Sequence, residues 1–254
     1  MAASFHQHVW IRRALAGLAW PMLRVGMHDL SHLAFYAEED AWGPMQRDEA
    51  LALHALLRVV RPRRVVEFGF LHGRSSFNML RALDPEARLW AFDVDPTARQ
   101  FATNLLAHDR RFTLHLKSQD AIEAKDVDGG PVDVVLLDAS HDLELNKRTF
   151  ARIIPLLAER ALFVIHDTGA WAAEHLRPPH AAQASAAPHG WVADGYAHQL
   201  DERLFVNWIA DEHPKFAHVH LHSANTLRHG MTVLQRSAPL PTEQRPGPAR
   251  PQRG

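Results

Sequence analysis

The chain has 254 residues, 46% hydrophobic and 22% charged, which is enough for one large α/β domain with a sizeable core. The formal net charge is -1, so bulk electrostatics give no indication of a nucleic-acid partner. The absence of cysteine excludes disulfides, thiolate metal sites and a cysteine nucleophile, and it suits the cytoplasmic location that we expect.

Residues 1–43 are expected to form an N-terminal helical extension. The apolar run at residues 9–25 contains arginines and a proline, so it is too short and too charged to span a bilayer. It also lacks the basic start and the cleavage site of a signal peptide. We expect this segment to pack on the domain, across the substrate mouth or on a second subunit, in which case the protein is a homodimer or higher homo-oligomer.

The next stretch of the chain predicts a helix, a strand and a glycine turn. Residues 46–60 have apolar side chains at helical spacing, and Pro62 ends the helix. Residues 65–68 read as a short buried strand. Gly69 and Gly73 then allow a tight turn in which the backbone closely approaches a ligand.

A second helix is predicted directly after this turn. Ser75 and Ser76 are suitable N-cap residues, and residues 77–83 continue the helix. A strand, a glycine turn and a helix N-terminus together present backbone N–H groups to a ligand. The sequence therefore predicts a ligand-binding loop at residues 69–76.

The rest of the chain alternates strands and helices, which is typical of a parallel sheet. The further predicted strands are 89–92, 112–116, 132–137, 161–165, 217–222 and 231–235, and the further helices are 96–107, 143–157 and 201–211. We therefore expect an α/β fold with a doubly wound, mostly parallel, seven-stranded Rossmann-like sheet, helices on both faces and a C-terminal antiparallel hairpin. Residues 169–200 are expected to form a loop or lid, and residues 237–254 a disordered tail.

Chemically useful side chains come directly after several predicted strands. In a doubly wound sheet, ligands bind at the carboxyl ends of the strands. Asp93, Asp138, His166 and Asp167 all fall at such ends and are expected to share one edge with the glycine turn.

The loop does not match the common nucleotide motifs. A phosphate loop requires Gly-x-x-x-x-Gly-Lys-Ser/Thr, and a dinucleotide fingerprint requires Gly-x-Gly-x-x-Gly; both are absent. Three residues separate Gly69 from Gly73, which leaves room for a ligand without phosphate.

The stretch from Glu67 to Ser76 resembles the first motif of class I S-adenosylmethionine-dependent methyltransferases. The resemblance implies that Asp93 holds the ribose hydroxyls, with Asp95 as the competing residue, and that Asp120 and Ala121 line the adenine. The cofactor-binding residues expected on this basis are Glu67, Gly69, Gly73, Ser75, Ser76, Asp93, Asp120, Ala121 and Asp138.

The second half is similar to macrocin- and mycinamicin-type sugar O-methyltransferases and cephalosporin-hydroxylase-like proteins. The likeness runs from about residue 43 to residue 236, within an expected methyltransferase-like domain at 44–236. It implies that Asp138, His166 and Asp167 bind a divalent metal, Mg²⁺ or Mn²⁺. The related metal enzymes carry Glu-Asp where this chain has His166 and Asp167, and imidazole suits Mn²⁺ better than Mg²⁺.

The same resemblance assigns His141 as general base. Transfer of a methyl group to oxygen requires deprotonation of a weakly acidic hydroxyl, which a metal and a nearby imidazole would assist. The expected function is S-adenosylmethionine-dependent O-methylation of a small hydroxylated metabolite, of sugar or natural-product type. The alternatives are a metal-independent small-molecule methyltransferase and a non-catalytic protein that binds S-adenosylmethionine.

Overall fold

The structure, a computed structural model, describes residues 30, 32–33, 45–168, 200–222 and 230–236. The chain divides into two units, residues 1–33 and 34–254. Of the first unit only residues 30, 32 and 33 are described, the last two in a short 3-10 turn. The expected N-terminal extension, the loop at 169–200 and the C-terminal tail lie almost wholly outside the described residues. The elements and the site described here all belong to the second unit.

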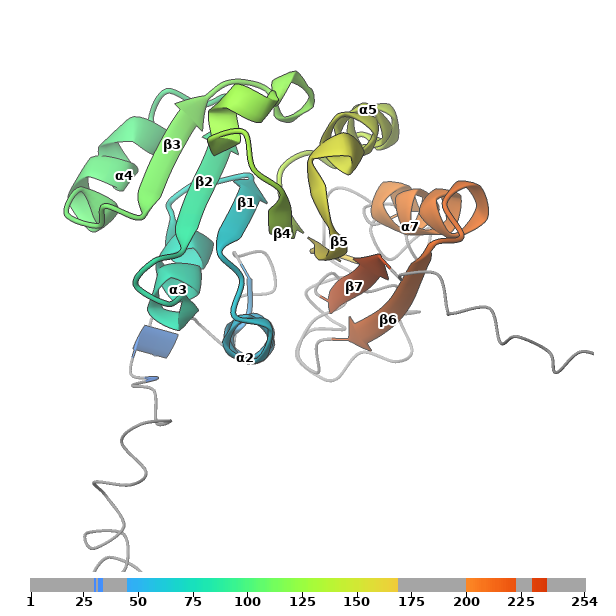
Figure 1. The fold of residues 1–254 in the computed structure, drawn as a ribbon, viewed down its shortest axis with the longest axis horizontal. Helices are drawn as coiled ribbons and strands as arrows, with labels where there is room; N and C mark the ends of the chain where they lie inside the picture. The colour runs from blue at the N-terminus through green and yellow to red at the C-terminus, as the bar shows by residue number, and fades with distance from the viewer. Residues whose placement is uncertain (1–29, 31, 34–44, 169–199, 223–229, 237–254) are drawn as a thin grey trace, which may run out of the picture. The chain divides into compact units, whose positions relative to one another are not determined.

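In the described part of this unit, seven strands form one sheet in the order β3-β2-β1-β4-β5-β7-β6 (Figure 1). The pairs from β3 to β5 are parallel, and β7 runs antiparallel to both β5 and β6. The strands are β1 (Arg64–Phe68), β2 (Arg88–Asp93), β3 (Phe112–Leu116), β4 (Val132–Leu137), β5 (Leu157–Ile165), β6 (Phe216–His222) and β7 (Gly230–Arg236). The predicted mostly parallel sheet with a C-terminal antiparallel pair is confirmed.

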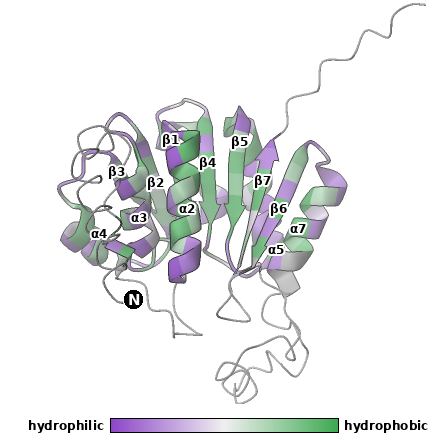
Figure 2. Cartoon of the chain, turned by 90° about the horizontal axis from the view of Figure 1, so that it is seen from below, coloured by the Kyte–Doolittle hydropathy of each residue, from purple (hydrophilic) through white to green (hydrophobic). Residues whose placement is uncertain are grey.

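Helices cover both faces of the sheet. Figures 1 and 2 show α2 and α3 on one face and α5 and α7 on the other. The helices are α2 (Arg47–Val60), α3 (Arg74–Ala82), α4 (Ala98–Leu106), α5 (Leu143–Ile153) and α7 (Leu200–Glu212), with 3-10 turns η2 (Gln119–Ala121), η3 (Ala124–Val127) and η4 (Ile154–Leu156). No described helix combines the length and the apolar character needed to cross a membrane.

The central strand β1 has buried side chains on both of its faces, as expected for a strand covered by helices on two sides. Val66 and Phe68 belong to the same core cluster as Phe150 of α5. Because side chains alternate along a strand, Glu67 points to the opposite face, where it contacts α3. Figure 2 shows the hydrophobic character of the central strands.

The position of α7 is set by aromatic packing. The rings of Phe205 and Trp208 each lie 5.9 Å from the ring of Phe150, in edge-to-face geometry. Phe205 is fully buried. Glu202 lies one helical turn before Phe205, so this packing also sets the direction in which Glu202 points.

The strand register brings several carboxyl ends to one edge. Phe68 pairs with both Phe92 and Leu137, and Leu137 pairs with Ile165. The residues that come directly after these four are Gly69, Asp93, Asp138 and His166. The predicted convergence of these residues at one edge of the sheet is confirmed.

The prediction that Ser75 and Ser76 act as N-cap residues is wrong. The N-cap of α3 is Gly73, so the two serines lie inside the first turn of the helix. Their hydroxyls donate to the buried carboxylate of Glu67. A buried acceptor beneath the helix competes successfully with the capping role that serine often has.

Three further element boundaries differ from the prediction by two residues or more. The helix predicted from Pro96 begins at Ala98, because Asp95 forms a preceding turn and its Oδ1 accepts from Thr97 N at 2.8 Å. The helix predicted to reach residue 157 ends at Ile153 and passes into a 3-10 turn that contains a proline. Strand β5 begins at residue 157, four residues earlier than predicted.

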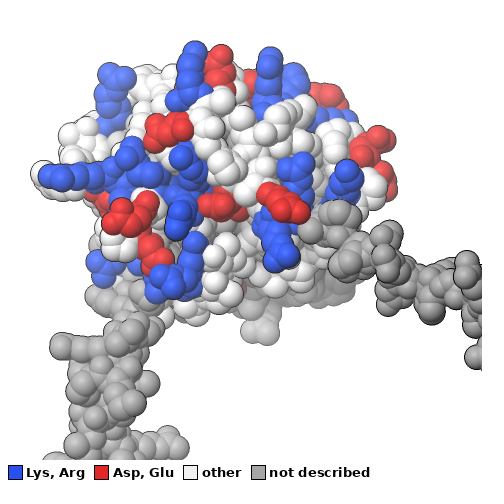
Figure 3. Space-filling view, in the orientation of Figure 1, with Lys and Arg blue, Asp and Glu red and all other residues white. Residues whose placement is uncertain are grey.

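Charged side chains of both signs are interspersed on the face shown in Figure 3. Lys and Arg side chains gather at the left of this view, with Asp and Glu side chains beside them.

Candidate active site

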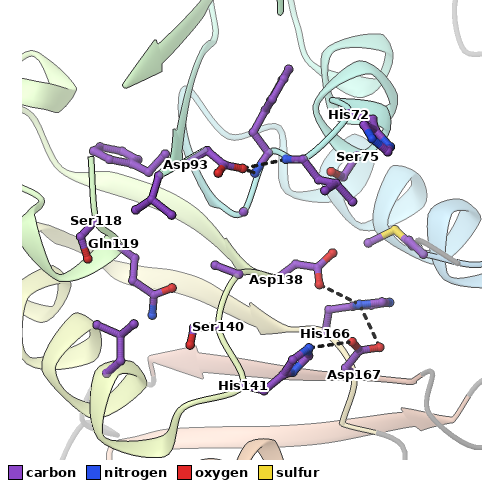
Figure 4. Close-up of a pocket in the computed structure, with 18 of the residues that line it drawn as sticks. His72, Ser75, Asp93, Ser118, Gln119, Asp138, Ser140, His141, His166 and Asp167 are labelled. Carbon is purple, nitrogen blue, oxygen red and sulfur yellow. Dashed lines mark hydrogen bonds and ion pairs between the residues drawn. The ribbon is translucent and has the colours of Figure 1, made fainter. Parts of the chain in front are cut away.

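A cavity of about 550 Å³ opens at the carboxyl edge of the sheet, within the size range of small-molecule sites (Figure 4). Its walls come from the glycine turn, the ends of β2, β3, β4 and β5, and the loop before α5. The turn residues and polar side chains that line it include Gly69, Ser75, Asp93, Lys117, Ser118, Gln119, Asp138, His141, His166 and Asp167.

The glycine turn brings its backbone close to β4. Gly69 has φ +93°, and a Cβ there would lie 1.9 Å from the carbonyl oxygen of Asp138. Gly73 has φ +76°, and a Cβ there would lie 2.5 Å from the ring of Phe70. Both positions therefore require glycine, both for backbone conformation and for space.

Glu67 lies beneath this turn. It is fully buried, its two carboxylate oxygens accept from the hydroxyls of Ser75 and Ser76, and it is absent from the cavity wall. Burial, together with the charges of Asp138 and Asp93, raises the pKa of Glu67 to about 8, against the hydrogen bonds of Ser75 and Ser76, which lower it. Glu67 therefore joins β1 to α3 and supports the turn from below, while Ser75 reaches the cavity.

Asp93, at the end of β2, stabilises the glycine turn through hydrogen bonds. Its Oδ2 accepts from the backbone N–H of Phe70 at 3.0 Å and of Leu71 at 2.8 Å, and its Oδ1 accepts from Asp95 N at 2.9 Å. Of the two aspartates considered for the ribose, Asp93 lines the cavity and Asp95 does not.

The residues after β3 that line the cavity come earlier in the chain than the sequence predicted. Neither Asp120 nor Ala121 lines the cavity; the side chain of Asp120 instead contacts Ser118 Oγ at 2.6 Å and Arg148 Nε at 3.1 Å. Lys117, Ser118 and Gln119 line it instead. The signal that marks these three residues is their position directly after the end of β3.

Asp138, His166 and Asp167 form a compact cluster (Figure 4). Nδ1 of His166 lies 3.1 Å from Asp138 Oδ1 and 3.3 Å from Asp167 Oδ1. His166 and Asp167 are buried, whereas Asp138 is partly exposed to the cavity. Asp167 has φ +56°, a left-handed backbone conformation that is uncommon outside glycine and often marks functional sites.

A buried carboxylate that sequence analysis missed contacts the other side of the His166 ring. Glu49 Oε2 of α2 lies 3.1 Å from His166 Nε2. Burial alone would lower the pKa of His166, but the charges of Asp138, Glu49 and Asp167 raise this pKa well above its ordinary value.

His141 has a carboxylate partner that the sequence also did not reveal. Its Nδ1 contacts the carboxylate of Glu202 on α7, and its Nε2 lies 4.0 Å from Asp167 Oδ2. The side chain of His141 is 40% exposed, which leaves it open to the cavity. Burial raises the pKa of Glu202, against the hydrogen bond and charge of His141. In this pair, the carboxylate of Glu202 orients the His141 ring through Nδ1, an arrangement typical of a general base.

The residues present fit both groups that the sequence resemblance implies. The glycine turn at Gly69 excludes any side chain and opens onto a cavity large enough for an adenosyl ligand. The ligand atoms of Asp138, His166 and Asp167 all lie within 4.8 Å of one another. Two carboxylates and one imidazole suit Mn²⁺, Fe²⁺ or Zn²⁺ better than Mg²⁺, which prefers oxygen ligands.

The sequence is similar to those of known methyltransferases. Residues 66–168 match the family described as a methyltransferase domain. A curated relative, the 8-demethyl-8-(2-methoxy-alpha-L-rhamnosyl)-tetracenomycin-C 3'-O-methyltransferase of Streptomyces olivaceus, is 28% identical over 194 residues. The match covers 72% of this chain and 47% of the relative, so the chain spans about half the length of that protein.

Solved structures share the fold. The O-methyltransferase TomG of Streptomyces achromogenes, in complex with SAM, has a TM-score of 0.60 at 18% identity and covers 87% of this chain and 96% of its own. The O-methyltransferase of Bacillus cereus, in complex with SAH, has a TM-score of 0.57 at 16% identity and covers 87% of this chain and 97% of its own. At this identity the likeness concerns the Rossmann-like methyltransferase fold alone.

Proposed function

We propose that the chain carries a class I S-adenosylmethionine-dependent methyltransferase domain and that the protein methylates a hydroxyl oxygen of a small metabolite. The observation that carries this proposal is the placement of His141, paired with Glu202, on the same cavity as the glycine turn. Methyl transfer to oxygen needs a base close to the cofactor, and the cavity provides one.

His141 serves as the general base. Contact with the carboxylate of Glu202 holds a proton on Nδ1, which leaves the Nε2 lone pair to accept the proton of the acceptor hydroxyl. The resulting imidazolium lies between the carboxylates of Glu202 and Asp167, which stabilise its charge. The deprotonated oxygen would then bond to the methyl carbon in line with the carbon–sulfur bond, which would break as S-adenosylhomocysteine leaves, so much of the acceleration would come from positioning.

The cofactor is proposed to lie along the glycine turn, with its ribose toward Asp93. Both oxygens of Asp93 already accept backbone N–H groups, so this residue also fixes the conformation of the turn. Ser118 and Gln119 are proposed to face the adenine. Gln119 is pre-oriented, because its Nε2 donates to Asn146 at 2.8 Å and to Thr149 at 2.9 Å.

Asp138, His166 and Asp167 are proposed to hold a divalent metal. When bound, such a metal lowers the pKa of a coordinated hydroxyl and so assists its deprotonation. Asp138 is the partly exposed member of the group and faces the cavity (Figure 4), so an acceptor placed there also lies near His141.

We propose a sugar hydroxyl, or a hydroxyl of a glycosylated natural product, as the acceptor class. The printed name of the Streptomyces olivaceus relative describes 3'-O-methylation of a rhamnosyl group, and this supports the proposal. The polar residues that line the cavity, which include Ser140 and Lys117, suit a polar acceptor.

The test is a methyl-transfer assay with purified protein, S-adenosylmethionine and a panel of hydroxylated acceptors, with S-adenosylhomocysteine formation as the readout. The panel holds free and glycosidic rhamnose-type sugars, phenols and amines, each with Mn²⁺, with Mg²⁺ and with EDTA. We expect turnover of the sugars with Mn²⁺ and loss of turnover in EDTA. Full activity in EDTA would favour the metal-independent alternative, and cofactor binding without turnover would favour a non-catalytic protein.

A further inference from the structure

Glu49 makes more contacts than its place in α2 explains. It occupies the third position of the helix, where Oε2 accepts from the backbone N–H of Gln46 at 2.8 Å, a capping-box contact. Its Oε1 also accepts from the backbone N–H of Gly230 in β7 at 2.5 Å. Oε2 further contacts His166 Nε2 at 3.1 Å, and the side chain of Glu49 is only 3% exposed. One carboxylate therefore joins α2, β7 and the residue after β5.

The chemistry of a carboxylate limits the protonation of His166. An ionised carboxylate only accepts hydrogen bonds, so a ring nitrogen that faces it carries a proton. Glu49 therefore places a proton on Nε2 of His166. Nδ1 points toward Asp138 and Asp167 and, by the same rule, carries a proton in the metal-free protein. Because Glu49 is not part of the metal cluster, Nδ1 is the nitrogen whose proton a metal ion shared with Asp138 and Asp167 would replace, while Nε2 keeps its proton.

We propose that Glu49 is a positioning residue that fixes the Nε2–H tautomer and the ring orientation of His166, so that Nδ1 serves as a metal ligand beside Asp138 and Asp167. The inference rests on the metal site of the proposed function. Glu49 lies outside residues 66–168, which match the methyltransferase family, so this part of the site comes from the flanking helix.

The same arrangement occurs widely in metal proteins, in which a ligating histidine donates its second N–H to a carboxylate and thereby gains orientation and basicity. Burial strengthens the effect here, because His166 is 3% exposed and water cannot replace Glu49 as the partner. The bond between Glu49 and Gly230 holds the carboxylate in place, so the ring has one favourable orientation.

Glu49→Gln tests the inference, because the amide keeps the shape but replaces one acceptor by a donor. With its oxygen toward Gly230 N–H, the amide NH₂ faces Nε2 of His166 and favours the opposite tautomer, with the proton on Nδ1. The NH₂ also faces the backbone N–H of Gln46, so the variant loses that capping-box bond, which the control below accounts for. We expect the affinity for Zn²⁺ and Mn²⁺, measured by calorimetry, to fall about 10- to 100-fold. In ¹⁵N-histidine NMR with Zn²⁺, the wild type is expected to show Nε2–H with Nδ1 bound to metal.

A matched control separates tautomer control from helix stability. Gln46→Ala removes the other side chain of the capping box and leaves the carboxylate of Glu49 in place, so it should lower the melting temperature but keep the metal affinity. The histidine signal is assigned by its loss in His166→Asn.

The inference is overturned if Glu49→Gln leaves both the tautomer and the metal affinity unchanged, or if the metal-saturated wild type carries protons on both nitrogens of His166. It is also overturned if the wild type binds neither metal. Methyl transfer by that wild type in EDTA would then show that the O-methyltransferase proposal stands without the metal site.

Discussion

Two histidines of the site each contact a buried glutamate through one ring nitrogen. This contact determines which nitrogen of each histidine faces the cavity chemistry. Glu202 contacts Nδ1 of His141 and leaves Nε2 as the base. Glu49 contacts Nε2 of His166 and leaves Nδ1 for Asp138 and Asp167. The same type of side chain is thus directed to two roles by which of its nitrogens is held.

His141→Ala tests the base directly. We expect kcat to fall about 10²- to 10⁴-fold, because the variant has no imidazole to accept the proton of the acceptor hydroxyl. The affinity for S-adenosylhomocysteine should change little. Glu202→Gln should lower kcat less, because it disturbs the tautomer of His141 and leaves the imidazole in place. Steady-state kinetics and calorimetry measure the two quantities. His108→Ala, at an exposed histidine away from the cavity, is the control. Unchanged kcat in His141→Ala would rule out the role of base.

The sequence predicted the part of the site that lies at strand ends. Asp138, His166 and Asp167 come after β4 and β5, and the rule for parallel sheets places such residues together. Glu49 and Glu202 were not predictable, because they lie on helices 117 and 61 positions away from the histidines that they contact. The packing of those helices decides where their carboxylates point, and single-sequence patterns do not contain that information.

Among the elements, β1 and α3 carry the glycine turn of the site between them. Glu67 ties the strand to the helix from below, and Asp93 ties the turn to β2. The strands and the glycine turn were readable from hydrophobic runs and glycine spacing. The first turn of α3 was not, because the hydroxyls of Ser75 and Ser76 serve a buried carboxylate and not the helix end.

Gly69→Ala tests how closely this turn approaches β4. The added Cβ would lie 1.9 Å from the Asp138 carbonyl oxygen, at a φ of +93°. We expect a loss of about 2–4 kcal/mol in the free energy of unfolding and at least a tenfold loss of S-adenosylhomocysteine affinity. Gly129→Ala is the matched control: its φ is +68°, but nothing lies within 4 Å, so about 1 kcal/mol of strain is expected. Equal effects of the two changes would contradict the close approach.

For the whole molecule, the buried Glu67 links folding stability to pH. Its pKa is raised to about 8 in the folded protein, against 4.5 for an exposed glutamate. Because the folded state binds the proton more tightly, the stabilisation is fully present below about pH 4.5 and is lost as pH rises through 8. The free energy of unfolding should therefore decrease from pH 5 to pH 8, by roughly 3 kcal/mol from this group.

Glu67→Gln isolates this contribution, because the amide has no charged form. Urea denaturation at pH 5, 6.5 and 8 should show a flatter pH dependence for the variant than for the wild type. Parallel curves for the two proteins would mean that Glu67 does not couple protonation to folding.

The central claim is that the cavity at the carboxyl edge of the sheet binds the methyl-donor cofactor. The most direct measurement is calorimetric titration of the purified protein with S-adenosylhomocysteine, with NAD as the control ligand. We predict a dissociation constant in the micromolar range or tighter, about −8 kcal/mol, and no heat with NAD. A folded protein that binds NAD, or that gives no heat with S-adenosylhomocysteine with or without Mn²⁺, would contradict this claim.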